Sequence, residues 1–249
     1  MATMTTNMSS PTHAMNRLIQ RHPVQRLSSP SRGFSALVHI LGLASYSYSY
    51  NYLIANPNHI SQAYGWHFQY LTIIGLTLAT TTFGLGLIAD TTLSPRVFAA
   101  KNVLSMCSAP MEVLISVLYW GLRAVDPELV VPKELELPVS ADVSFHLAPS
   151  VLLLVDILLL SPPWTITAVP AVVLSVAIAF AYWFWIELCY SYNGFYPYPL
   201  FGMLEQTQRV GLFTASALIM AANTMILKWL YARVNGVGKP SVERPGKVK

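Results

Sequence analysis

The chain has 249 residues, of which 54% are hydrophobic and only 10% charged, and its formal net charge is +4. A soluble domain carries about a quarter charged residues, so this composition excludes a water-soluble globular protein and indicates that lipid surrounds most of the chain. The basic residues lie in the two ends and the short connections rather than along one polar helix face, which excludes a nucleic-acid-binding surface.

The first segment, residues 1–32, is rich in Ser, Thr, Pro and Arg and contains no acidic residue. Such a segment has too little apolar surface to bury a core, so it is predicted to be a disordered basic tail in the cytoplasm. The same composition is typical of a mitochondrial transit peptide, and the sequence leaves that alternative open.

Six apolar stretches follow, each close to the ~20 residues that cross about 30 Å of hydrocarbon as a helix. Backbone in lipid must be hydrogen-bonded, and no alternating barrel pattern is present, so each stretch is predicted to be helical. The expected fold is an all-α integral membrane protein, a single bundle of six transmembrane helices over residues 33–232. The stretches are residues 33–55, 68–89, 103–122, 143–160, 166–190 and 211–231.

Positive residues predict the orientation, because connections rich in Lys and Arg stay in the cytoplasm. With both termini cytoplasmic, twelve Lys and Arg lie inside and only three, Arg123, Lys133 and Arg209, lie outside. Residues 233–249 then form a second basic cytoplasmic tail. On this topology Arg96 and Lys101 belong to a cytoplasmic connection.

Ionisable side chains inside the spans are functional candidates, because each is costly at bilayer depth. We expect His39 and Lys228 to pack or snorkel near the cytoplasmic face. Glu112 and Glu187 are expected to be hydrogen-bond partners between helices. The full set is His39, Glu112, His146, Asp156, Glu187 and Lys228.

Thr72 and His146 are predicted to lie at the same depth. Each follows the outer boundary of its span by about four residues, or ~6 Å. Thr72 continues into a stripe of small residues at Gly75, Ala79 and Thr82, which suits close helix contact and places Thr72 inside the bundle. A hydroxyl beside an imidazole is the minimum of an activated nucleophile.

Two alternatives weaken this prediction. A threonine in a membrane helix usually bonds back to a carbonyl one turn earlier. The neighbouring hydroxyls of Thr77, Thr80, Thr81 and Thr82 also qualify as nucleophiles.

The surroundings of this pair supply further candidates. Asp142 lies one turn above His146 and is close enough to orient its ring, whereas Asp156 lies ~15 Å deeper. Trp66, Tyr70 and Tyr198 fall in one aromatic belt and are candidates for oxyanion or substrate contacts. The loop residues His59 and His67 are expected to be solvated. No nucleotide-binding, zinc-protease or serine-hydrolase motif occurs in the sequence, and no metal or other cofactor is expected.

Several motifs in chain order resemble those of the androgen-induced family of membrane hydrolases. They are residues 63–74 (AYGWHFQYLTII), residues 126–133 (DPELVVPK), Phe145-His146 with Asp156 ten positions on, and residues 193–200 (NGFYPYPL). The resemblance spans about residues 33–232. Pro149 comes two residues earlier than the matching proline of the animal members, and the basic N-terminal tail has no counterpart there.

The resemblance implies a six-span threonine hydrolase that cleaves fatty acid esters of hydroxy fatty acids, with Thr72 as nucleophile and His146 as general base. Its partner is then a lipid ester that enters from the bilayer, and not a nucleic acid. The expected location is the endoplasmic reticulum or plasma membrane, with mitochondria as the alternative. The competing hypothesis is a non-enzymatic transporter or membrane scaffold.

Overall fold

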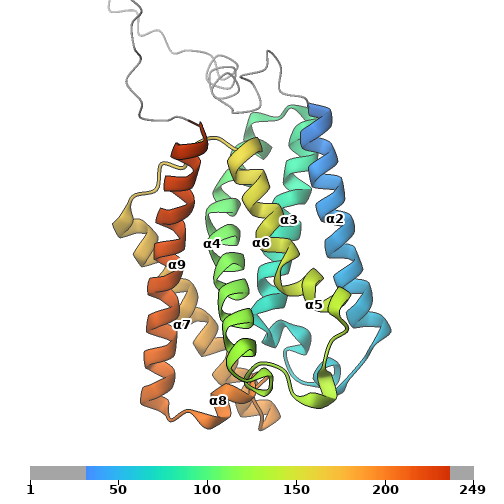
Figure 1. The fold of residues 1–249 in the computed structure, drawn as a ribbon, viewed down its shortest axis with the longest axis vertical. Coiled ribbons are helices and arrows are strands. Elements are labelled where there is room, and N and C mark those ends of the chain that lie inside the picture. Colours follow the sequence, from blue (N-terminus) through green and yellow to red (C-terminus); the bar gives the residue numbers. More distant parts are fainter. Residues whose placement is uncertain (1–31, 236–249) are drawn as a thin grey trace, which may run out of the picture.

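The computed structural model describes residues 32–235, and within that range every regular element is helical (Figure 1). Of the tails predicted over residues 1–32 and 233–249, residues 1–31 and 236–249 lie outside the described residues, whereas Arg32 and residues 233–235 are helical. The long helices pack side by side into one bundle. In chain order the elements are α2 (Arg32–Ala55), η2 (His59–Gln62), η3 (Trp66–Gln69), α3 (Leu71–Thr92), α4 (Pro95–Val125), η4 (Pro127–Leu129), η5 (Lys133–Leu135), α5 (Val139–His146), α6 (Ala148–Val155), η6 (Asp156–Leu160), α7 (Ala168–Asn193), α8 (Pro199–Met203) and α9 (Gln206–Asn235).

Four helices in the described range, α3, α4, α7 and α9, are long and apolar enough to cross a membrane. The pair α5 and α6 with η6 adds a fifth if the two bent parts form one span. The remaining long helix, α2, has 24 residues, but Ser and Tyr alternate through its second half and lower its apolar character. The all-α membrane fold is therefore confirmed, with four or five spans established by length and composition.

Most helix ends differ from the predicted ones by a few residues, and the start of α4 differs most. Helix α4 begins at Pro95, eight residues before the expected start, because Ser94 accepts a capping hydrogen bond from the Val97 N–H and Pro95 suits the first helical turn. Arg96 and Lys101 are thus helical rather than part of a connection. Helix α9 extends to Asn235, beyond the predicted domain end at residue 232.

The fourth predicted span is broken rather than continuous. Helix α5 ends at His146, and the chain turns by 44° before the helix resumes in α6. Pro149 lies in the first turn of α6, where its fixed φ and missing N–H are tolerated. In the interior of one continuous helix the same proline would remove a backbone hydrogen bond. The final turn, η6, is a π-helix that begins at Asp156. This break leaves His146 at a helix end.

Helix α3 lies between α2 and α4, and its small residues allow both neighbours to approach closely. A Cβ on Gly75 would lie 2.6 Å from a carboxylate oxygen of Glu112 on α4, and a Cβ on Gly86 would lie 2.3 Å from the His39 ring on α2. Thr72, Gly75, Ala79 and Thr82 are all buried. The predicted small-residue stripe therefore does face the bundle interior.

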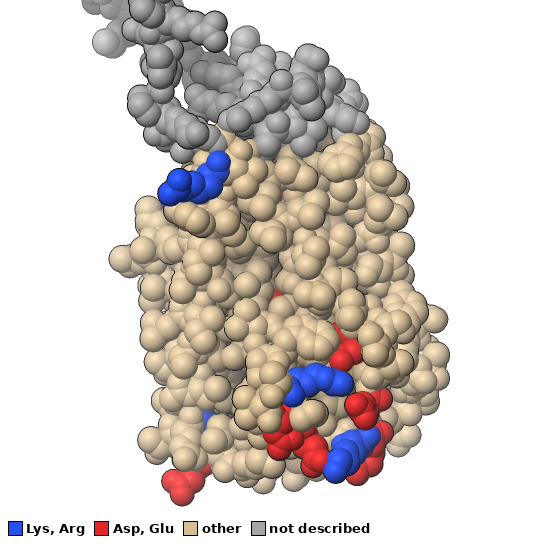
Figure 2. All heavy atoms as spheres, in the orientation of Figure 1, with Lys and Arg blue, Asp and Glu red and all other residues tan. Residues whose placement is uncertain are grey.

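The charged atoms visible in Figure 2 gather near the two ends of the bundle, most of them at the lower end. The band between these ends is almost free of charge on this face. The beginning of α2 and the end of α9 both lie at the upper end, on opposite sides of the bundle (Figure 1). The broken helix and the connections around η3, η4 and η5 meet at the lower end.

Candidate active site

Thr72 lies in the first turn of α3, because the chain forms the short helix η3 where the second span was expected to begin. Its side chain is 6% exposed. The hydroxyl oxygen of Tyr198 accepts a hydrogen bond of 3.2 Å from the Leu71 N–H, one residue before Thr72. Tyr198 therefore lies against the start of α3, where Thr72 is the second residue.

The other threonines of α3 are committed to their own helix. Each donates its hydroxyl proton to the carbonyl four residues earlier: Thr77 to Ile73 at 2.7 Å, Thr80 to Leu76 at 2.7 Å, Thr81 to Thr77 at 2.8 Å and Thr82 to Leu78 at 2.8 Å. A hydroxyl in this arrangement has its proton directed away from any ligand. Thr77 also forms a hydrogen bond with the Tyr50 hydroxyl at 2.9 Å, and Thr82 with Ser108 at 3.2 Å, so both side chains are held within the bundle.

His146, the last residue of α5, is held from two sides. Its Nδ1 lies 2.9 Å from the Asp142 carboxylate one turn earlier, and its ring stacks on Tyr119 of α4 at a centroid distance of 3.5 Å. The Ser116 hydroxyl donates to the His146 carbonyl, which the helix end leaves without an intrahelical donor. With Nδ1 engaged by a carboxylate, Nε2 is the nitrogen that can accept a proton.

Arg123 fixes the far side of Asp142. Its guanidinium lies 3.3 Å from the second carboxylate oxygen, donates to the Tyr119 hydroxyl at 3.0 Å, and lies 3.5 Å from Glu136. Asp142 is thus bracketed by an imidazole and a guanidinium. The sequence indicated Asp142 as an orienting residue, but it gave no reason to connect Arg123 and Tyr119 with the site.

Two cavities meet at Thr72. The first, which we term the apolar cavity, measures about 140 Å³ and lies between α4, α7 and α9. The second, the loop cavity, measures about 90 Å³ and lies between η3, α5 and the connection around η5. Thr72, Tyr119, Val130 and Tyr198 line both, whereas His146 lines the loop cavity alone.

The other residues predicted to belong to the site differ in whether they line a cavity. Tyr70 lines the loop cavity, whereas Trp66 packs on His67 and Phe68 and lines neither cavity. His67 is 1% exposed and lines the loop cavity, so the expectation that it is solvated is wrong. The backbone folds its ring inward because Trp66 adopts a positive φ of 48° at the start of η3. Burial raises the pKa of Tyr198, which keeps its hydroxyl protonated.

The family described as FAR-17a/AIG1-like protein matches residues 34–232. The chain belongs to the FAR-17a/AIG1-like family. A UPF0641 membrane protein of Schizosaccharomyces pombe is 32% identical to it over 215 residues, which cover 85% of this chain and 96% of that protein. No solved structure matches the chain. The matches confirm the resemblance to the androgen-induced proteins and the assignment as a membrane protein.

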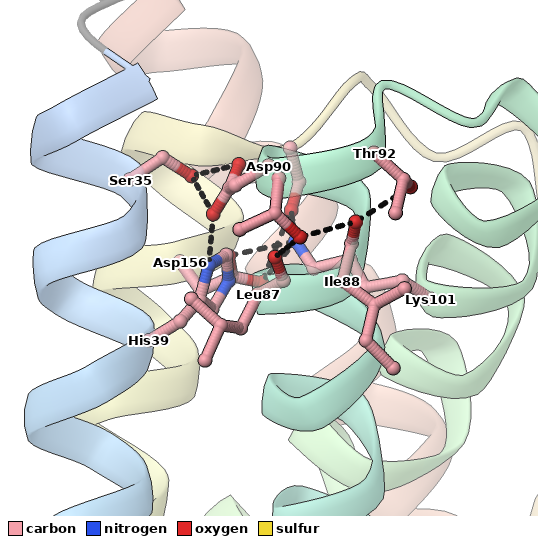
Figure 3. Close-up of polar contacts among 10 residues, drawn as sticks. Ser35, His39, Leu87, Ile88, Asp90, Thr92, Lys101 and Asp156 are labelled. Carbon is pink, nitrogen blue, oxygen red and sulfur yellow. Dashed lines mark hydrogen bonds and ion pairs between the residues drawn. The ribbon is translucent and has the colours of Figure 1, made fainter.

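This FAR-17a/AIG1-like chain also has a second polar cluster, near the end of the bundle opposite Thr72 (Figure 3). Lys101 of α4 donates to the Asp156 carboxylate at 2.7 Å and to Ser161 at 2.8 Å. His39 of α2 bridges two carboxylates, with Nδ1 2.7 Å from Asp90 and Nε2 3.2 Å from Asp156. Lys101 is 1% exposed and Asp156 is fully buried.

The cluster corrects several expectations about single ionisable residues. Lys101 is not in a cytoplasmic connection, and His39 is bridged between carboxylates rather than snorkelling. Lys228 donates to the Ile166 carbonyl at 2.7 Å. Glu187 of α7 pairs with Arg209 of α9 at 3.4 Å, as expected of a partner between helices, and it also accepts from Trp183 and Tyr196. The buried carboxylate of Glu112 has no hydrogen-bond partner in the described range, so that expectation is wrong for Glu112.

Proposed function

We propose that this protein is a membrane-embedded threonine hydrolase that cleaves fatty acid esters of hydroxy fatty acids through a Thr72 acyl-enzyme, with His146 as general base. The observation that carries the proposal is that Thr72 and His146 line one cavity, with Nδ1 of His146 engaged by Asp142. Nucleophile, base and orienting acid are the three parts that a covalent hydrolase of this type requires.

The reaction has two steps. As the Thr72 hydroxyl attacks the ester carbonyl, His146 Nε2 accepts its proton and then delivers that proton to the departing alcohol. Water then attacks the acyl-threonine ester while His146 accepts a proton from the water, and collapse of the intermediate returns the proton to Thr72 as the fatty acid leaves. Asp142 stabilises the imidazolium in both steps, and Arg123 holds Asp142.

Tyr198 is the best placed of the three predicted oxyanion candidates. Burial keeps its hydroxyl protonated, and Tyr198 lines both cavities together with Thr72, so it can donate to an oxygen that becomes negative there. Tyr70 borders the same cavity and is the second candidate. Trp66 is too poorly placed for the role because its ring lies outside both cavities.

The membrane arrangement that goes with this activity has six spans and both ends in the cytoplasm. Helix α2 runs alongside α3, and both described ends of the chain lie at the same end of the bundle, which supports an even number of crossings (Figure 1). The lipid ester then enters laterally from the bilayer. We place the protein in the endoplasmic reticulum or plasma membrane, with mitochondria as the alternative.

Fluorophosphonate labelling tests the nucleophile, because the reagent reacts with a hydroxyl only where a base accepts its proton. We expect the purified protein to be labelled at Thr72. Thr72→Ala should abolish labelling and lower hydrolysis by on the order of 10³-fold or more, and Thr72→Ser should retain part of both. Thr77→Ala and Thr80→Ala are the matched controls, since both hydroxyls bond back to their own helix.

The double variant separates an enzyme from a scaffold. If Thr72 and His146 act in one step, Thr72→Ala, His146→Ala and the double variant should lose similar amounts of activity. A transporter or scaffold would tolerate loss of the Thr72 hydroxyl. Near wild-type hydrolysis of a branched fatty ester by Thr72→Ala would refute the threonine mechanism and make His67 the next residue to test.

A further inference from the structure

Resting on the proposed function, we propose that the two cavities divide the substrate: the acyl chain occupies the apolar cavity, and the alcohol half, the hydroxy fatty acid, occupies the loop cavity. Thr72 lies where the cavities join, so an ester carbonyl placed beside its hydroxyl has one cavity on each side. The two arms of the ester leave the carbonyl in different directions, and each must enter one of these spaces.

The position of the base decides which arm goes where. His146 lines the loop cavity and not the apolar cavity. In the first step it must deliver a proton to the alcohol oxygen as the ester bond breaks, which requires that oxygen to lie on the His146 side. The alcohol half therefore leaves through the loop cavity, and the acyl chain stays on Thr72 with its tail in the other space.

The chemistry of the apolar cavity fits a hydrocarbon chain. Its wall extends from Leu122 to Met111 on α4 and from Leu212 to Met220 on α9. At 1.5 Å per residue these stretches run about 16 Å and about 12 Å inward from the end of the bundle that holds Thr72. The side chains along them are almost all Leu, Ile, Met, Ala and Phe, which gain from contact with methylene groups.

The chemistry of the loop cavity fits the polar half. Asn58 and His67 line it in addition to His146, and its remaining wall combines apolar residues of the connections around η4 and η5 with side chains of α2, α3, α4 and α5. The Nε2 atom of His67 is buried and has no hydrogen-bond partner in the described range. A hydroxy fatty acid brings a carboxyl group that can accept a hydrogen bond from this nitrogen, whereas the same carboxyl group is costly to bury against the apolar wall of the other cavity.

Selective filling of each cavity tests the assignment by kinetics. Ala217→Phe adds a ring to the apolar cavity, and Ala222→Phe makes the same change at an exposed position of the same helix. We expect Ala217→Phe to lower kcat/KM by on the order of tenfold or more for esters with a long acyl chain and a small alcohol. Acetate esters of long-chain alcohols should be hydrolysed as before, and Ala222→Phe should change neither series.

Val131→Phe, in the wall of the loop cavity alone, should show the converse pattern. It should slow the esters of long-chain alcohols and spare those with a long acyl chain. The reverse pairing of variants and substrates would overturn the assignment, as would equal effects on both series.

Photocrosslinking reports the acyl position without turnover, so its outcome is independent of the proposed function. Palmitate that carries a diazirine at its far end should crosslink to peptides of α7 and α9 in the Thr72→Ala protein. Adding Ala217→Phe should reduce that labelling by on the order of tenfold, and adding Ala222→Phe should not. Crosslinks confined to η3, α5 or the connection around η5 would refute the assignment even if hydrolysis were confirmed.

Discussion

At the scale of single residues, the start of a helix determines which threonine is available. Inside α3 the hydroxyls of Thr77, Thr80, Thr81 and Thr82 each bond to the carbonyl four residues earlier, which lies one helical turn away. Thr72 lies in the first turn of α3, and the carbonyl four residues before it, that of Phe68 in η3, accepts a hydrogen bond from the Trp185 indole. A threonine one turn deeper in α3 has the same side chain, but its hydroxyl bonds to its own helix and is not available to a substrate.

The contact between Asp142 and His146 gives the first prediction. Asp142→Asn keeps the shape of the side chain but removes the charge that stabilises the imidazolium, so hydrolysis should fall by on the order of 10³-fold while the protein stays folded. Steady-state kinetics on purified protein measure the loss. Glu134→Gln, a charge removal at an exposed position of the neighbouring connection, should leave the rate unchanged. An Asp142→Asn enzyme with the wild-type rate would remove Asp142 from the mechanism.

His67 gives a prediction about pH. Burial lowers its pKa below the ordinary value of 6.5, so the unfolded chain binds a proton more readily than the folded protein does. Above pH 6.5 His67 is neutral in both states, and its full contribution to stability is present. As the pH falls from 6.5 towards the lower folded pKa, the unfolded chain binds a proton that the folded protein does not, and the free energy of unfolding decreases.

Thermal unfolding in detergent at about pH 7.5 and about pH 5.5 measures this effect. The decrease in Tm on acidification should be smaller in His67→Phe than in the wild type. His59→Phe, at an exposed position before it in the chain, is the control. An unchanged decrease in His67→Phe would show that other groups account for the pH dependence.

At the scale of elements, the buried cluster joins four separate segments: α2, α3, α4 and η6 (Figure 3). Lys101→Met removes the cation that pairs with Asp156 and leaves a carboxylate at 0% exposure with one partner fewer. We expect a loss of about 3–5 kcal/mol in stability. Lys101→Met combined with Asp156→Asn should recover at least half of it, since no buried charge is then left unpaired.

Thermal unfolding of the two variants in detergent measures this difference. Lys133→Met is the matched control, because that lysine pairs with Glu128 at the exposed end of the bundle and its removal should change stability little. Equal losses in the single and double variants would mean that packing of the Lys101 stem, not its charge, holds these segments together.

The same elements show what could be read from the sequence. The length of the apolar stretches predicted where each long helix lies in the chain, although not its exact ends. The stripe of small residues predicted which face of α3 is buried. The capping signal Ser94-Pro95 would have placed Lys101 two turns inside α4, but the pairing of Lys101 with Asp156 depends on contacts 55 residues apart. The break after His146 depends on how α5 packs, so a proline alone did not specify it.

At the scale of the whole molecule, the distribution of charge distinguishes the two ends of the bundle. The end with η4 and η5 carries acidic and basic residues together, including the Arg123–Glu136 and Lys133–Glu128 pairs. Basic residues outnumber acidic ones towards the chain termini. This asymmetry favours termini in the cytoplasm. In the proposed orientation Thr72 and the loop cavity lie at the opposite face, close to the water that the proposed second reaction step consumes.

Cysteine accessibility tests this topology. In a chain with Cys107 and Cys189 replaced by Ala, Glu134→Cys reports the end that holds η5, and Arg233→Cys reports the end where α9 finishes. Six spans with cytoplasmic ends require the two positions to face opposite compartments. In sealed microsomes an impermeant maleimide should therefore label Arg233→Cys at once and Glu134→Cys only after detergent is added. Labelling of both positions in sealed vesicles would mean that they face the same side of the membrane. The chain would then cross the membrane an even number of times between residues 134 and 233, which contradicts the six-span topology. Import of the protein into mitochondria, with a matrix-facing Arg233→Cys, would instead support the transit-peptide alternative.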